Sequence, residues 1–154
     1  MKLYQLKTVQ RFPVGSEKLW EFIATPKNLA VITPASMGFK TKSGDEREMF
    51  AGQIIDYTIT PLLGLKMDWV TEITHVENGS YFVDEQRFGP YAFWHHKHFL
   101  VDTEFGCEMT DVVHYKVPMG FLGQLVHPFL VRPKLEQIFE FRRKKLIALF
   151  GAID

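Results

Sequence analysis

Alternation of apolar and polar positions dominates the middle of the chain and predicts β-strands. Between residues 66 and 76 every second residue suits a covered face, and the segment 108–117 alternates in the same way. Asn78-Gly79 and Gly89-Pro90 separate consecutive runs and are typical of tight turns. We therefore expect an antiparallel meander with one covered face and one face in water. The other predicted strands span 3–12, 51–60, 81–88 and 93–102.

Helical spacing marks two other parts of the chain. Two short helices are expected over 16–34, where residues typical of helix starts precede short apolar patterns. A longer helix is expected over 121–150, because apolar residues recur there every three or four positions. Pro128 and Pro133 interrupt this pattern and predict a kink or break near Arg132.

The order of elements predicts a fold class. An antiparallel sheet needs a cover on its apolar face, and the C-terminal helix is the only predicted element long enough to provide it. We therefore expect one α+β domain over residues 1–154, in which a curved antiparallel sheet wraps around that helix and encloses a space. The helix residues expected to pack against the sheet are Leu135, Ile138, Phe139 and Leu146.

Composition and charge exclude several classes of function. Lys and Arg together number 18, as do Asp and Glu, so the chain has no basic excess for nucleic acid, and no nucleic-acid partner is expected. The single cysteine, Cys107, excludes an internal disulfide. Neither an apolar run of about 18 residues nor a signal-peptide pattern is visible, so we expect a cytoplasmic protein without stable membrane insertion. The 14 phenylalanines must line a core or a cavity.

Three segments carry a resemblance to a known superfamily. They are FVDEQRFGPY at 82–91, WHHKHF at 94–99 and DVVHYKVP at 111–118. With the element order, they resemble a bacterial branch of the START-related, polyketide cyclase/dehydrase-like (SRPBCC) superfamily. The resemblance implies the helix-grip fold over the whole chain and a cavity for a hydrophobic ligand. It does not imply one reaction, because this fold hosts lipid carriers, hormone sensors and cyclases.

The hairpins predict a register, and the register predicts a polar row. A two-residue turn at Asn78-Gly79 would place Glu77 opposite Ser80, and the later loops would then place Asp84, His98 and Asp111 side by side on three strands. The covered face of the last strand carries Asp111 and Tyr115, so the whole row should lie inside. The neighbouring rows would be Gln86–His96–Val113 and Phe88–Trp94–Tyr115.

This row has two interpretations. One imidazole can satisfy two carboxylates and form a buried network that only fixes the sheet, or the row can face a ligand. In the second case the catalytic candidates are His98, Asp84 and Asp111. The side chains expected to contact a ligand are Tyr57, Trp69, Gln86, Phe88, Trp94, His96, His98, Tyr115, Phe129 and Phe139.

Other candidate chemistry is expected to be absent. Alternating histidines on a strand are common without a metal, so we expect neither a metal nor a cofactor. Cys107 follows a turn and lacks the surroundings of a nucleophile. The basic run 142–145 fits a solvated helix face, and His75, His95, His114 and His127 are expected at the surface or at strand ends.

Three functions remain open at this point. The first, which we favour, is binding of a hydrophobic small molecule for transport or sensing, between the sheet and the C-terminal helix. The second is a cyclase- or dehydratase-type enzyme acting on an aromatic or polyketide-like substrate. In it, His98 would be the acid or base and His96 or Tyr115 would assist. The third is a regulatory protein whose ligand gates a partner. The residues do not specify the ligand or the oligomeric state.

Overall fold

The computed structural model describes residues 2–61 and 64–153. The strands are β1 (Tyr4–Phe12), β2 (Lys40–Ser43), β3 (Gln53–Ile59), β4 (Met67–Glu77), β5 (Tyr81–Phe88), β6 (Phe93–Thr103) and β7 (Gly106–Lys116). The helical elements are α1 (Ser16–Ile23), the 3-10 turns η1 (Pro26–Ala30) and η2 (Ala35–Met37), α2 (Gly120–Val126), the π-turn η3 (His127–Val131) and α3 (Arg132–Phe150). The short elements β2 and η2 are additions to the predicted order.

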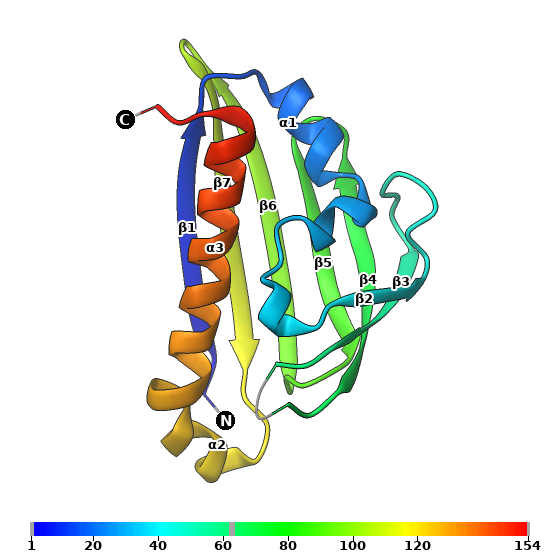
Figure 1. Cartoon of the computed structure of the whole chain (residues 1–154), viewed down its shortest axis with the longest axis vertical. Coiled ribbons are helices and arrows are strands. Elements are labelled where there is room, and N and C mark those ends of the chain that lie inside the picture. The colour runs from blue at the N-terminus through cyan, green and yellow to red at the C-terminus, as the bar shows by residue number, and fades with distance from the viewer. Residues whose placement is uncertain (1, 62–63, 154) are drawn as a thin grey trace.

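The strands form one curved antiparallel sheet in the order β1-β7-β6-β5-β4-β3-β2. Figure 1 shows α3 lying along one face of this sheet beside β1 and β7, with α1 and the segment that follows it next to α3. The predicted fold class is therefore confirmed. Strand β1 pairs with β7 along its whole length, from Tyr4 opposite Tyr115 to Phe12 opposite Cys107. The first strand of the chain therefore lies beside the last one.

The C-terminal helix changes geometry where its prolines lie. Pro128 lies inside the π-turn η3, and α3 begins at Arg132 with Pro133 in its first turn. A proline inside a helix lacks the N–H for the regular bond and crowds the preceding turn, and the irregularity predicted near Arg132 takes the form of this π-turn, while the helical backbone continues through it. Beyond it, α3 packs as expected on the sheet: Leu135, Phe139 and Leu146 are buried, and Ile138 is partly buried.

The register of β6 and β7 is as predicted. Asp102 pairs with Cys107, His98 with Asp111, and Trp94 with Tyr115. The hairpin between β4 and β5 differs, because Glu77 pairs with Tyr81 across a three-residue loop in which Gly79 has φ +77°. A β-bulge between Ile73 and His75 then shifts the register back by one residue. Ile73 therefore still faces Asp84, as predicted.

The predicted register of β5 and β6 is wrong by two residues. Asp84 pairs with His96, and Phe82, in place of Asp84, pairs with His98. The ladder ends where Glu85 pairs with His95, so the connecting loop is wider than the sequence indicates. A slip of two residues leaves each side chain on its predicted face, since side chains alternate with a period of two.

The wide loop between β5 and β6 is held by Gln86. Its Nε2 donates to the Tyr91 carbonyl oxygen over 2.7 Å, and its Oε1 accepts from the Tyr91 N–H over 3.1 Å. We expect Gln86→Ala to lower the free energy of unfolding in urea by about 1–2 kcal/mol, since two partly buried hydrogen bonds are lost. Arg87→Ala, which removes only exposed ion pairs on the same strand, should cost less than about 1 kcal/mol. Equal losses in the two variants would contradict a holding role for Gln86.

Candidate functional site

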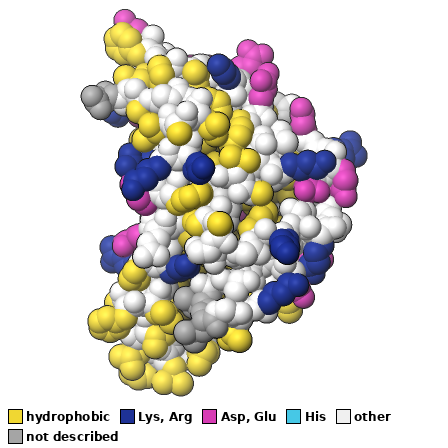
Figure 2. All heavy atoms as spheres, in the orientation of Figure 1, with side chains coloured by type: hydrophobic (Ala, Val, Ile, Leu, Met, Phe, Trp, Pro, Cys, Tyr) yellow, Lys and Arg dark blue, Asp and Glu magenta, His cyan; other side chains and the backbone are white. Residues whose placement is uncertain are grey.

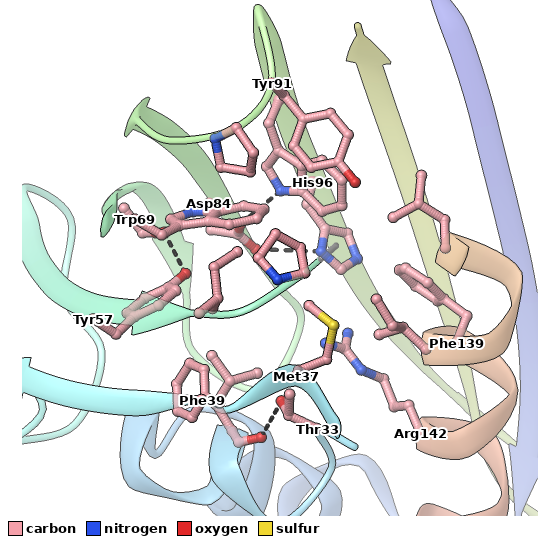
Figure 3. A pocket seen from close by; sticks show the side chains of 18 of the residues that line it. Thr33, Met37, Phe39, Tyr57, Trp69, Asp84, Tyr91, His96, Phe139 and Arg142 are labelled. Carbon is pink, nitrogen blue, oxygen red and sulfur yellow. Dashed lines mark hydrogen bonds and ion pairs between the residues drawn. The ribbon is translucent and has the colours of Figure 1, made fainter. Parts of the chain in front are cut away.

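A cavity of about 440 Å³ lies between the sheet and α3. Its sheet wall includes Tyr57 and Trp69 from β3 and β4, and its helix wall includes Leu135, Ile138 and Phe139. Leu29 and Met37, from the short turns after α1, close a further side. Figure 3 shows Met37, Tyr57, Trp69 and Phe139 converging from separate elements on one space. Only the gripped arrangement of sheet and helix brings them together.

Four polar side chains form a cluster on the inner sheet wall of this cavity. His98 joins both aspartates, with Nε2 2.8 Å from Asp84 Oδ2 and Nδ1 2.8 Å from Asp111 Oδ1. His96 Nε2 lies 2.9 Å from the same Asp111 oxygen, while its Nδ1 lies 3.4 Å from Asp84 Oδ2. His98 therefore bridges the two carboxylates as expected, although it reaches Asp84 diagonally and shares both partners with His96.

Neighbouring groups complete the hydrogen bonding of the two carboxylates. Trp94 Nε1 donates to the second oxygen of Asp84 over 3.3 Å, and Thr8 Oγ1 lies 3.5 Å from the second oxygen of Asp111. Asp111 is only 1% exposed, so its charge depends on these partners. Each carboxylate oxygen in the cluster therefore already has a donor.

The cluster shifts the pKa of each of its members. Burial alone would raise the pKa of Asp111 and Asp84, but the histidines outweigh it, so the pKa of Asp84 is lowered and that of Asp111 lies well below its usual range. Burial also opposes protonation of His98, yet its hydrogen bonds to Asp111 and Asp84 raise its pKa. In His96, burial and the charge of His98 prevail and lower the pKa to about 4.

These directions define the charge state of the cluster near neutral pH. Both aspartates are ionised and His96 is neutral, while carboxylate oxygens 2.8 Å from both nitrogens of His98 favour its doubly protonated form. In the tautomer of neutral His96 that donates from Nε2 to Asp111, Nδ1 is unprotonated and lies 3.4 Å from Asp84 Oδ2. The cluster thus presents a proton donor and a proton acceptor side by side, with ring centroids 3.7 Å apart.

The same atoms are the candidates for a metal. Asp84, His96 and His98 each offer one ligand atom, and these atoms lie within 4.8 Å of one another. Two histidines and one carboxylate form a known set of ligands for transition metals. Here, however, both His98 nitrogens are within hydrogen-bond distance of carboxylates, so a metal would have to displace the His98 proton.

The structure brings most of the sequence-predicted residues to the cavity. Of the predicted contact and catalytic residues, those that line it are Tyr57, Trp69, Asp84, Trp94, His96, His98, Asp111 and Phe139. Whether they contact a ligand remains a prediction, but their placement around one cavity is an observation. They come from strands β3 to β7 and from α3, as the register and the helical pattern indicate.

Four predicted contact residues do not line this cavity, which corrects the expectation for them. Phe88 is 66% exposed at the end of β5, where the pairing with β6 has already stopped, and Gln86 is used by the Tyr91 loop. Phe129 is 82% exposed because the π-turn rotates it away from the sheet. Tyr115 is buried on the inner face but lies beyond the cavity, on the side of β1.

Tyr115 belongs instead to a second, more polar cavity of about 380 Å³ between β1 and α3. Its hydroxyl lies 2.8 Å from His127 Nε2, and His127 stacks on Tyr4 at 3.6 Å between ring centroids. The expectation that His127 lies at the surface or at a strand end is wrong, since it is buried in the π-turn. Asp111, Phe139 and Arg142 line both cavities and so form the boundary between the apolar space and the polar one.

Arg142 lines the cavity and was missed at the sequence level. It was expected on a solvated face with its basic neighbours, but it lies on the inner side of α3 with its guanidinium 5.0 Å from the Phe139 ring centroid. The helical period contains the signal, because positions 135, 139, 142 and 146 follow the spacing of a buried stripe. Figure 3 shows Arg142 reaching from α3 toward Met37 in the cavity.

One end of the molecule exposes apolar side chains beside the cavity. Met119, Val126 and Leu130 line the cavity and are also partly in water. Phe121, Leu122 and Leu125 continue this apolar surface over α2, which Figure 2 shows at the lower end of the view. Among the described residues, no helix is both long and apolar enough to cross a membrane.

Comparisons with known proteins agree with the geometry. Protein CV1439 from Chromobacterium violaceum superposes with a TM-score of 0.69 at 16% identity, covering 97% of this chain and 99% of that one. The major latex-like protein 151 from Panax ginseng gives 0.69 at 13% identity, covering 96% and 97%. A Thalictrum norcoclaurine synthase point mutant, in complex with a transition-state analogue, gives 0.67 at 16% identity, covering 96% of each chain.

The chain has the helix-grip fold. Its likeness to START-related and pollen-allergen-like proteins therefore holds at the level of structure, as the resemblance of the three segments implied. No protein-family model matches the chain, and no curated protein matches it. At these identities the helix-grip fold is what is shared, so the function must be argued from the cavity itself.

Proposed function

We propose that this helix-grip protein binds a hydrophobic small molecule in the cavity between the sheet and α3. The observation that carries the proposal is the cavity of about 440 Å³, whose wall is mostly aliphatic and aromatic and contains a few grouped polar side chains. Sites for small molecules typically measure roughly 300–1,000 Å³ and combine such walls with a few polar groups that orient the ligand. Transfer of apolar ligand surface from water supplies about 25 cal/mol per Å².

The exposed apolar surface over α2 supports the same function. It continues into residues of the cavity wall, so an apolar molecule could pass between surface and interior without crossing charged groups. Large exposed apolar patches are uncommon on monomeric proteins and often mark binding surfaces. We therefore assign the entrance of the cavity to the end formed by Met119, Val126 and Leu130.

A cavity-filling substitution tests the proposal. Ile138→Trp should lower the affinity for apolar ligands at least tenfold, because the larger side chain occupies the space that the ligand needs. Leu149→Trp, on the exposed part of the same helix, is the matched control and should bind as the unaltered protein does. Native mass spectrometry of the purified protein should detect a small molecule of stoichiometric amount that Ile138→Trp lacks. Equal binding by the two variants would refute the cavity as the site.

A second function is favoured by one specific observation. Protonated His98 and neutral His96 lie together at the cavity wall and can act as acid and base on a bound substrate. In a cyclase- or dehydratase-type reaction, His96 Nδ1 would turn from its 3.4 Å contact with Asp84 to take a proton from carbon, and His98 would give an oxygen one of the two protons that it otherwise donates to Asp84 and Asp111. Tyr115, an expected assistant, lies on the other side of Asp111 and has no part in this version. Turnover of an aromatic or polyketide-like substrate that is lost in His98→Asn, with ligand binding kept, would establish it.

A further inference from the structure

Two buried donors in the cavity lack an acceptor. Arg142 Nε on α3 and Trp69 Nε1 on β4 are buried and have no hydrogen-bond partner among the residues that the structure describes. A buried N–H without an acceptor has lost its hydrogen bond to water without replacing it, so such groups are rare without a reason. Both line the same cavity, which suggests one shared reason: a bound molecule that carries acceptor atoms.

The charge of Arg142 also lacks a partner. Within the described part of the chain, no carboxylate lies within 4.0 Å of its guanidinium, whereas Arg143, next along the helix, pairs with Glu140 at 2.8 Å. The positive charge of Arg142 reaches Asp84 and Tyr57 only over longer distances, where it favours their ionised forms. The face of Phe139 supports the guanidinium but supplies no acceptor oxygen.

The polar cluster does not compete with Arg142 for an anionic group. Asp84 and Asp111 have a donor at each oxygen, and a second anion beside them would be repelled. An anionic group of a ligand is therefore stable only on the helix side of the cavity. Trp69 lies on the opposite, sheet side, where a neutral oxygen suffices because an indole N–H carries no charge.

We propose that the ligand is an apolar carboxylic acid whose carboxylate binds Arg142 and whose other end carries a hydroxyl or carbonyl oxygen that accepts from Trp69. This inference rests on the proposed function and specifies the chemical class of its ligand. A planar guanidinium and a carboxylate match in geometry, and their hydrogen bonds are roughly twice as strong as neutral ones. The apolar body of the ligand would span the space between the two donors.

Calorimetric titration with three probes of equal chain length tests the assignment: decanoate, decanol and ω-hydroxydecanoate. The unaltered protein should bind decanoate at least about tenfold more tightly than decanol, and ω-hydroxydecanoate more tightly still. Arg142→Met should remove the preference for the acid but keep decanol binding. Lys144→Met removes the same charge from the exposed side of the same helix and should change nothing. Trp69→Phe should remove only the gain from the ω-hydroxyl group.

The outcomes distinguish the carboxylic acid assignment from the proposed binding of an apolar ligand. If decanol binds as tightly as decanoate, or if Arg142→Met keeps the preference for the acid, the carboxylate assignment is wrong while the apolar binding function stands. If none of the three probes binds the unaltered protein and no small molecule co-purifies with it, both are wrong. If Lys144→Met loses the preference for the acid as fully as Arg142→Met does, the preference comes from the net charge of the helix. The proposed role of Arg142 would then be wrong.

Discussion

Replacing His98 by leucine is expected to lower the free energy of unfolding by about 3–5 kcal/mol. The imidazole bridges Asp84 and Asp111 at 2.8 Å on each side, in a site where His98 is only 8% exposed. Leucine fills a similar volume but donates no hydrogen bond, so Asp84 Oδ2 and Asp111 Oδ1 would have only His96 in common. One of them would have to take up a proton or remain buried without its donor, and either result costs stability.

Urea denaturation at neutral pH measures this loss. The control is His114→Leu, which makes the same change on β7 at a position that faces away from the cavity, opposite His95. It should alter the free energy of unfolding by less than about 1 kcal/mol, as most substitutions outside the core do. A loss in His98→Leu no larger than in this control would show that the cluster contributes nothing net to the fold.

The two cavity histidines should titrate on opposite sides of their ordinary value near 6.5. A proton NMR titration should place the midpoint of His96 at about 4 and that of His98 above 6.5. Both histidines are buried, but in His96 burial and the charge of His98 outweigh the carboxylates, one of which is 3.4 Å away, whereas His98 lies 2.8 Å from a carboxylate at each nitrogen. Two coincident midpoints near 6.5 would contradict the observed hydrogen-bond arrangement.

The free energy of unfolding should depend on pH in the way that these pKa shifts require. Because the folded pKa of His98 is raised, its contribution is complete below pH 6.5 and is lost as the pH rises through the folded value. Because the folded pKa of His96 is lowered, the unfolded chain takes up its proton first, and stability falls as the pH drops from 6.5 to about 4. The aspartates add a further loss at lower pH, as it falls through their lowered values. The contribution of the cluster should therefore be greatest near pH 6.5, and the part of it that is lost above this pH should be absent in His98→Leu.

Most of the fold could be predicted because its signals repeat along the chain. Alternation in 67–73 and 108–117 predicts strands and also their covered face, while the helical period assigns Leu135, Phe139 and Leu146 to the packing face. The parity of side chains is insensitive to a slip of two residues, which is why Asp84, His96 and His98 were placed correctly although their register was wrong.

What could not be predicted depends on geometry that no local pattern records. The diagonal contact of His98 with Asp84 depends on the width of the loop held by Gln86, and Phe129 turns outward because of a π-turn. Arg142 was hidden by its charge, since a basic run at the end of a helix usually faces water. The helical period, which places position 142 in line with 135, 139 and 146, was the signal against that expectation.

The hairpin between β4 and β5 has a consequence for the evolution of the sequence. Its loop has three residues, one more than the two-residue turn that the sequence predicts, and this difference alone would move the side chains of β4 to the opposite face of the sheet. The β-bulge between Ile73 and His75 returns them to the predicted face. Either change alone would rotate Ile73 and the start of β4 to the outer face and empty part of the cavity wall. Insertions and deletions in this hairpin should therefore survive only in pairs, one in the loop and one at the bulge. Among related chains, gaps a few residues apart in this region should appear together, and a solitary gap should be rare.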